Sequence, residues 1–265
     1  MHGRTVLITG ATSGIGLETA REIARREATV LMGCRNLQKA SVVRDELVSQ
    51  TGNADIRVLP VDLAPLASVR AFAGVLEKEI PQLDVLVNNA GAFSMTRETT
   101  SDGFELTMGT NHLGPFLLTH LLVPLLARGS NARVVNVASD AYKYGRIRFD
   151  DFDMDRRYGG FRAYAASRLA TVLFTQDLAD LLRSRTITAN SCHPGHVNTN
   201  IWPQTSGLIR VAMKISSRFR ITAAEGAAPS IHLACSPEVA DVTGTYFDRL
   251  NPVELEPRFT DPALR

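Results

Sequence analysis

Tyr164 and Arg168 are the residues of this sequence whose types and spacing first suggest chemistry. They lie in "YAASR" (164–168), inside a longer stretch, 161–184, whose apolar residues recur with helical spacing. Because residues four apart share one face of a helix, we expect the phenol and the guanidinium to lie side by side. A free tyrosine has a pKa of about 10, and a nearby cation stabilises its phenolate form. The pair is therefore a candidate acid–base centre, and the alternative is an ordinary surface pair.

A glycine-rich turn, "TGATSGIG" (9–16), follows the first apolar run and opens the first helical pattern. Gly10 would allow the tight turn, Gly14 would let the backbone approach a pyrophosphate, and Gly16 would permit close packing. The start of the following helix would add amide donors and partial positive charge. The turn therefore favours dinucleotide binding over an ordinary strand-to-helix connection.

Further cofactor candidates follow the next strands. The second strand ends in "GCRN", where a site for NAD commonly has an acid and this chain has Arg35. Arginine pairs with a 2′-phosphate, so Arg35 favours NADP(H), and a solvated surface arginine is the alternative. Asp62 could accept a bond from adenine or cap the next helix. In "NNAG" (88–91), the small Ala90 and Gly91 would let the backbone approach the cofactor.

The elements that must position these residues alternate along the chain. Apolar runs predict strands at 5–9, 28–34, 56–61, 84–88, 133–138, 187–192 and 244–247, and helical patterns occupy 15–27, 36–50, 65–80, 103–128, 161–184 and 224–235. This alternation predicts an α/β fold: a single-domain, Rossmann-like, doubly wound sheet over 1–265, with about seven mostly parallel strands and helices on both faces. Loops 140–160 and 196–223 begin at the carboxyl ends of strands, where we expect the substrate.

Composition narrows the function class. The chain has 265 residues, 45% of them hydrophobic, and its net charge of +2 comes from 29 basic and 27 acidic residues without a long run of one sign, so we expect no nucleic-acid partner. Cys34, Cys192 and Cys235 fit neither a disulfide framework nor zinc-ligand spacing. The first residues lead directly into a strand and no apolar stretch could span a bilayer, so we expect a cytoplasmic protein with no integral membrane segment.

Six motifs in this order resemble the short-chain dehydrogenase/reductase family. They are "TGATSGIG", "NNAG", "TNHLGPF" (110–116), "VVNVAS" (134–139), "YAASR" and "CHPGHVNT" (192–199). The resemblance covers about residues 4 to 250. Within the family, "GRIRFDDFD" before the tyrosine and "RLATVLFTQDLADLL" after it are similar to the retinol-dehydrogenase-like branch, whose members act on lipophilic carbonyls and alcohols, usually with NADP(H).

The resemblance also implies roles for individual residues. Tyr164 would be the acid–base residue, Ser139 would bond the substrate oxygen, and Asn111 would hold a water in a proton relay, with Arg168 beside them. The cofactor-binding positions would be Gly10, Ser13, Gly14, Ile15, Gly16, Arg35, Asp62, Leu63, Asn89, Ala90, Gly91, Tyr164, Arg168, Pro194, Gly195, Val197 and Thr199. Thr199 would contact the nicotinamide carboxamide. Family habit suggests a homodimer or homotetramer formed through the helices at 103–128 and 161–184.

Arg168 departs from the family pattern, in which a lysine stands four residues after the tyrosine. Arginine keeps the charge but spreads it over a larger planar group, so the contacts with the nicotinamide ribose would have to change. We therefore expect an NADP(H)-dependent oxidoreductase acting on a carbonyl or alcohol of an apolar small molecule, with activity that the arginine could reduce. The alternative is an NADP(H)-binding sensor or scaffold that lost catalysis with the lysine.

Three other features are interpreted as follows. His112, His193 and His196 show no spacing typical of a metal site, and we expect no metal. The acidic residues within 150–155 favour a solvated loop over a cation site. The segment 207–221 is amphipathic at helical spacing and favours a substrate lid, while a helix on a membrane surface and a packed surface helix are the alternatives.

Overall fold

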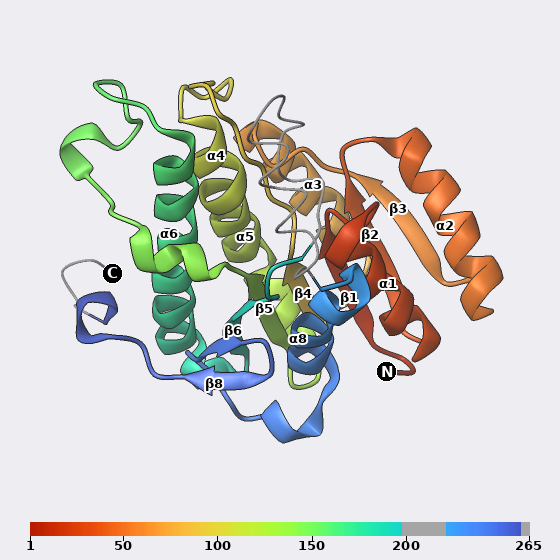
Figure 1. Ribbon diagram of the computed structural model, residues 1–265. Helices are drawn as coiled ribbons and strands as arrows, with labels where there is room; N and C mark the ends of the chain where they lie inside the picture. The colour runs from red at the N-terminus through yellow and green to blue at the C-terminus, as the bar shows by residue number, and fades with distance from the viewer. Residues whose placement is uncertain (198–220, 261–265) are drawn as a thin grey trace.

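One eight-stranded sheet organises the computed structural model, which describes residues 1–197 and 221–260 (Figure 1). Its strand order is β3-β2-β1-β4-β5-β6-β7-β8. The strands are β1 Thr5–Thr9, β2 Thr29–Cys34, β3 Ile56–Pro60, β4 Val85–Asn88, β5 Arg133–Val137, β6 Thr188–His193, β7 Tyr246–Asp248 and β8 Asn251–Val253. The order reverses direction beside β1, as in a doubly wound sheet, and this confirms the predicted fold class.

Seven of these strands run parallel, and β8 returns antiparallel beside β7. The parallel register pairs Asn88 of β4 with Asn136 of β5, and Asn136 with Ser191 of β6. The carboxyl ends of β4, β5 and β6 therefore lie level with one another. Residues that follow these three strands meet at one edge of the sheet.

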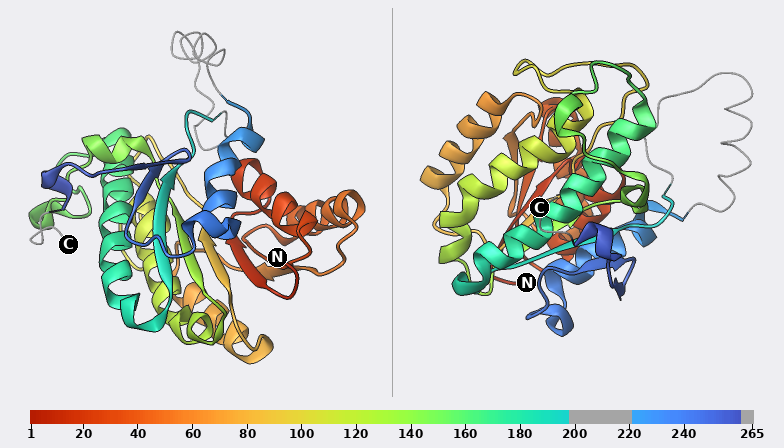
Figure 2. Two further views of the ribbon diagram at one scale, coloured as in Figure 1. Left: turned by 90° about the horizontal axis from the view of Figure 1, so that it is seen from below. Right: turned by 90° about the vertical axis from the view of Figure 1, so that its left-hand side faces the viewer.

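Helices cover both faces of the sheet, so the molecule has three layers (Figure 2). The helices are α1 Gly14–Arg25, α2 Leu37–Thr51, α3 Leu66–Glu79, α4 Leu106–Met108, α5 Gly114–Arg128, α6 Gly160–Leu182 and α8 Ala223–Cys235. Leu7 and Val134 pack in the core beneath α3, α5 and α6, whereas Val6 and Val135 pack in the core beneath α1, α2 and α8. Neighbouring strand residues thus point to opposite faces, and both faces are apolar, as expected of a buried parallel sheet.

The helix predicted at 103–128 is present from Leu106 to Arg128, but it contains a π-helical turn that the sequence did not predict. The short α4 is followed by a π-helical turn, Gly109–Leu113, before α5 begins. Buried Glu105 caps α4, accepting hydrogen bonds from the backbone amides of Thr107 and Met108 at 2.9 and 2.7 Å. A π turn contains one residue more than the equivalent α turn, and hydrophobic spacing alone does not detect such an insertion.

The two predicted substrate loops differ in how far the structure describes them. Segment 140–160 contains two short 3-10 helices, Asp140–Tyr144 and Phe149–Asp151. Residues 198–220, and with them Thr199 and nearly all of the proposed lid at 207–221, lie outside the described residues. Just before and after that stretch, Val197 and Ile221 form an isolated parallel bridge. None of the described helices is both long enough and apolar enough to span a bilayer.

Candidate active site

Tyr164 and Arg168 lie on the same face of α6, as their spacing predicts, and both are buried. The guanidinium carbon of Arg168 is 5.0 Å from the centroid of the Tyr164 ring. Arg168 Nη1 donates a hydrogen bond to the carbonyl of Val137, the last residue of β5, at 3.0 Å. This bond fixes the cation between α6 and the carboxyl end of β5. The structure therefore holds a positive charge beside a buried phenol.

Aromatic and small side chains enclose the other side of Tyr164. The ring of Phe93 meets the Tyr164 ring edge-on, with 5.8 Å between centroids, and Ala141 packs in the same apolar cluster. Phe93 follows β4, and Ala141 follows β5. Residues from three separate parts of the sequence thus form the walls around one phenol, which limits the entry of water at that point.

Ser139 lies two residues after β5 and begins the 3-10 helix Asp140–Tyr144. Its Oγ accepts a hydrogen bond from the Ala141 amide at 3.2 Å and donates one to Asp140 Oδ1 at 3.3 Å. Because Ala141 also packs against Tyr164, the serine hydroxyl is held close to the tyrosine by a short, capped turn. Its role toward a substrate oxygen remains a prediction.

Asn111 lies in the π turn, and its side chain makes hydrogen bonds within the protein. Its Oδ1 accepts from the Ala92 amide at 2.6 Å, while its Nδ2 donates to the Ala92 carbonyl at 3.0 Å and to Ser167 Oγ at 3.1 Å. Ser167 belongs to α6, between Tyr164 and Arg168. Asn111 thus joins the segment after β4 to the part of α6 that carries Tyr164 and Arg168. The water-holding role that the resemblance implies remains a prediction.

A buried polar chain beneath the site was not anticipated from the sequence. Asn88 Nδ2 donates to Asn136 Oδ1 at 2.9 Å and to Thr119 Oγ1 at 2.9 Å, and Asn136 Nδ2 donates to Thr175 Oγ1 at 2.9 Å. The four residues come from β4, β5, α5 and α6. Buried hydrogen bonds have a specific geometry. These bonds therefore help to fix the positions of α5 and α6 on the sheet.

The glycine-rich turn has the backbone that a phosphate group requires. Gly10 and Gly14 have φ angles of +69° and +57°, which favour glycine. A Cβ on Gly16 would overlap the Asn89 amide and the Gly10 carbonyl, so the turn packs tightly against the segment after β4. At the start of α1, the capping position Ser13 makes no side-chain bond, and the first turn contains no acidic residue. The first amides of α1 therefore remain available to an anion, and these residues fit a dinucleotide.

The remaining cofactor candidates lie at the same edge of the sheet. Arg35 is exposed directly after β2, whereas Asp62, after β3, accepts a bond from the Ala64 amide at 3.0 Å. Asn89 Nδ2 donates to the Thr9 carbonyl at 2.8 Å and so ties the turn after β1 to the one after β4. Gly195, after β6, has a φ of +87°. The remaining candidates, Ile15, Leu63, Ala90, Gly91, Pro194 and Val197, also follow strand ends or open α1.

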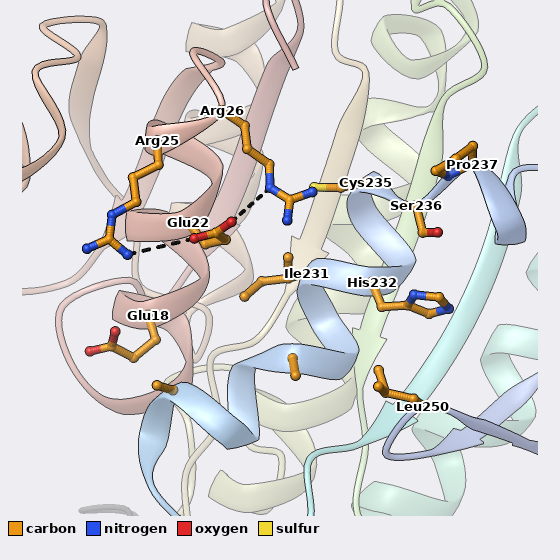
Figure 3. Close-up of a pocket in the computed structure, with 12 residues that line it drawn as sticks. Glu18, Glu22, Arg25, Arg26, Ile231, His232, Cys235, Ser236, Pro237 and Leu250 are labelled. Atoms are coloured by element: carbon orange, nitrogen blue, oxygen red, sulfur yellow. Dashed lines mark hydrogen bonds and ion pairs between the residues drawn. The ribbon is translucent and has the colours of Figure 1, made fainter.

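A separate groove of about 510 Å³ lies between α1 and α8 (Figure 3). Glu18 and Glu22 line it from α1, and His232 and Cys235 line it from α8. Glu22 is ion-paired there with neighbouring arginines. None of the lining residues belongs to the Tyr164 site. The groove is therefore distinct from the candidate active site.

The acidic residues within 150–155 bind neighbouring groups. Asp150 pairs with Arg148, and Asp153 Oδ1 accepts a hydrogen bond from the Glu105 amide at 2.9 Å. The Tyr158 hydroxyl donates to the Ser94 carbonyl at 2.9 Å, and burial together with the nearby Glu105 raises the pKa of Tyr158 to about 12. The Tyr158 hydroxyl therefore has a structural role, holding its loop to Ser94, whereas Tyr164 is proposed to transfer a proton.

The family model for short chain dehydrogenases matches residues 4–207. The chain therefore belongs to the short-chain dehydrogenase family. Retinol dehydrogenase 14 of Mus musculus is 44% identical over 277 residues, covering 100% of this chain and 83% of that protein. Retinol dehydrogenase 12 of Homo sapiens is 41% identical, covering 97% and 81%. These relatives confirm the retinol-dehydrogenase-like branch.

Solved structures agree with this assignment. A protein of Mycobacterium paratuberculosis superposes with a TM-score of 0.79 at 35% identity, covering 99% of this chain and 89% of its own. A short chain dehydrogenase of Shigella flexneri complexed with NADP has a TM-score of 0.75 at 26% identity, covering 95% and 98%. One of Escherichia coli complexed with NADPH has a TM-score of 0.75 at 25% identity, with the same coverages.

Sequence analysis of this short-chain dehydrogenase missed several residues that support its site. Ser167 could have been found from its position on the same helix face as Tyr164, three residues away. Phe93 and Glu105 are brought to the site region only by the fold, and no local sequence pattern identifies them. Asn136 resembles an ordinary polar residue in a strand, although its interruption of an apolar run, "RVVNVA", is a signal that could have been used.

Proposed function

We propose that this protein is an NADP(H)-dependent oxidoreductase that transfers a hydride between the nicotinamide and a carbonyl or alcohol of an apolar small molecule. The observation that carries the proposal is the buried phenol of Tyr164 with the Arg168 guanidinium carbon 5.0 Å from its ring centroid. Burying a cation destabilises the folded state unless the charge is compensated, and a cation beside a phenol can assist proton transfer.

Each residue of the site has a task in the reductive direction. The nicotinamide, when bound, supplies the hydride. The Tyr164 hydroxyl gives its proton to the carbonyl oxygen of the substrate, and the Ser139 hydroxyl donates a hydrogen bond to the same oxygen. The charge of Arg168 stabilises the phenolate that remains on Tyr164. In the oxidative direction the phenolate takes the proton back.

The cofactor would be held by the turn after β1 and by the strand ends beside it. The free amides at the start of α1 suit the pyrophosphate, and the exposed Arg35 suits a 2′-phosphate. The complexes of related dehydrogenases with NADP and NADPH support the same cofactor here. The names of the retinol dehydrogenase relatives support an apolar substrate such as a long-chain or polyene aldehyde.

Fluorescence titration with NADPH and NADH tests the cofactor assignment. We expect NADPH to bind more tightly to the wild type, and we expect Arg35→Asp to reverse the preference, because a carboxylate repels the 2′-phosphate and can accept bonds from the ribose hydroxyls. Arg44→Asp is the matched control, since Arg44 also belongs to the β2–α2 region and pairs with Asp45. Equal affinities in the wild type would refute the assignment.

Turnover separates the enzyme from the alternative, an NADP(H)-binding sensor or scaffold. The bond from Arg168 to the protein's own Val137 carbonyl is the observation that favours the alternative, because it uses part of the donor capacity inside the protein. We expect the wild type to oxidise NADPH in the presence of retinaldehyde or an activated diketone, and Tyr164→Phe to abolish this activity while NADPH binding persists. Turnover that survives in Tyr164→Phe would refute the assigned role of the tyrosine.

A further inference from the structure

A cluster of three potential ligands lies at the carboxyl ends of β5 and β6. Asp140 follows Ser139, His193 is the last residue of β6, and His196 comes three residues later. His193 Nε2 is 3.8 Å from Asp140 Oδ1, and His196 Nε2 is 3.7 Å from Asp140 Oδ2. One ligand atom from each residue can be chosen so that all three lie within 4.8 Å of one another. The spacing of the histidines in the sequence does not reveal this cluster, because only the fold brings Asp140 to them.

His193 points to a missing partner in this cluster. Its side chain is only 7% exposed, its Nδ1 has no hydrogen-bond partner, and its Nε2 is too far from Asp140 for a hydrogen bond. A buried polar group without a partner is unfavourable.

The geometry and charge of the cluster suit a small divalent ion. Ligands bound tetrahedrally to Zn²⁺ at about 2.1 Å lie about 3.4 Å apart, so the three ligand atoms, which lie within 4.8 Å of one another, would have to move closer by side-chain rotation. The carboxylate of Asp140 supplies the negative charge of the cluster. The His196 side chain is 74% exposed, so solvent water can reach the remaining coordination positions.

We propose that Asp140, His193 and His196 form a binding site for Zn²⁺ next to Ser139. Two imidazole nitrogens and one carboxylate oxygen favour a borderline transition ion over Mg²⁺ or Ca²⁺, which prefer oxygen ligands. The ion would bind His193 Nε2, which lies too far from Asp140 for a hydrogen bond. It would also bind the carboxylate that now accepts a hydrogen bond from Ser139 Oγ at 3.3 Å.

Zinc at this position lowers turnover, and this consequence rests on the proposed function. The ion withdraws Asp140 from the serine and puts a positive charge beside the hydroxyl that orients the substrate oxygen. The Ser139 oxygen is attracted to the ion, so the hydroxyl no longer has the orientation that the proposed function requires. Zinc therefore acts as a reversible inhibitor whose effect a chelator removes.

Competition with a chromophoric chelator measures binding of ZnCl₂ to the metal-free full chain. We expect one ion per chain in the wild type, with at least about tenfold weaker binding in His196→Ala and in Asp140→Asn, because each loses one of three ligands. His196→Ala changes an exposed side chain and should fold normally, which a thermal melt verifies. His232→Ala is the matched control, because His232 and Cys235 on α8 are another pair of ligand-type side chains (Figure 3).

Each outcome decides the proposal. Loss of zinc binding in His196→Ala and Asp140→Asn, with binding retained in His232→Ala, supports the site. Equal zinc affinity in the wild type and His196→Ala, or loss in His232→Ala alone, overturns it. Reductase assays with added zinc then test the consequence: inhibition that EDTA reverses and that His196→Ala lacks supports it, and an uninhibited zinc-bound enzyme refutes it. A chain that binds zinc at these residues but reduces no carbonyl contradicts the proposed function and leaves the metal site standing.

Discussion

Replacing Arg168 with methionine removes the cation beside Tyr164 while keeping a long side chain in the buried space. The guanidinium carbon is 5.0 Å from the ring centroid of Tyr164. At this separation, and with an effective dielectric constant of about 20, a unit charge stabilises a phenolate by about 3 kcal/mol. Since about 1.4 kcal/mol corresponds to a factor of ten in rate, and the phenolate charge is only partly developed in the transition state, we expect kcat/KM for carbonyl reduction to fall by about tenfold to 100-fold.

Arg168→Lys keeps the charge and tests what the guanidinium contributes. Arg168 Nη1 donates a hydrogen bond to the Val137 carbonyl, and its Nε is buried without a hydrogen-bond partner. One donor of the guanidinium is therefore unsatisfied. An ammonium concentrates the charge and can donate in three directions. We therefore expect Arg168→Lys to increase reductase activity above that of the wild type.

The assay is steady-state oxidation of NADPH with a diketone or an apolar aldehyde, accompanied by NADPH titration and a thermal melt for each variant. The same two changes at Arg162, an exposed arginine on α6 that bonds the Arg157 carbonyl, are the control and should leave kcat/KM unchanged. If Arg168→Met stays within about threefold of the wild type, the electrostatic argument is wrong. If the lysine variant is slower than the wild type, arginine is a specialised part of the site.

Three further predictions concern stability and reactivity. Asn136→Ala should lower the free energy of unfolding by about 1–3 kcal/mol in urea, because it breaks two buried hydrogen bonds, while the Thr175 hydroxyl keeps its bond to the Thr171 carbonyl; a loss below 1 kcal/mol would contradict this. Burial lowers the pKa of His112 from 6.5 to about 4. As the pH drops from 6.5 to 4, the imidazole is protonated in the unfolded chain before it is protonated in the folded one, so the free energy of unfolding decreases. His112→Gln should reduce that decrease by no more than about 3 kcal/mol, measured by urea unfolding at several pH values. Burial raises the pKa of Cys34 to about 11 and of Cys192 to about 12, so neither should react with iodoacetamide at pH 8 in the native state, as peptide mass spectrometry can check.

Local patterns predicted the features that depend on local physics. Apolar runs marked all seven parallel strands, because a strand buried on both faces must be apolar throughout. The glycine positions of the turn after β1 followed from backbone angles that only glycine adopts easily, and φ at Gly10 and Gly14 agrees. The neighbouring positions of Tyr164 and Arg168 followed from helical geometry alone.

Features that depend on distant contacts were not predictable in the same way. Strand β8 has three residues and contains Pro252, so nothing but its pairing with β7 identifies it. The hydrogen bond from Arg168 to Val137 joins α6 to β5, and helical spacing says nothing of the partner on another element. Asp140 and His196 are far apart in sequence and meet because β5 and β6 end side by side.

The π turn at Gly109–Leu113 has a consequence for how this chain can change in length. Deleting one residue there, for example Thr110, would let the backbone relax to an ordinary α-helix, which is locally more favourable. Each residue of an α-helix turns the chain by about 100°, so the deletion would rotate Asn111 relative to Ala92 and Ser167 and break the bonds that join them. Helices usually tolerate substitution and loops tolerate insertion or deletion, but here a helical segment must keep its exact residue count. Comparison of natural length variants should therefore find insertions and deletions in the surrounding loops and none between residues 105 and 114.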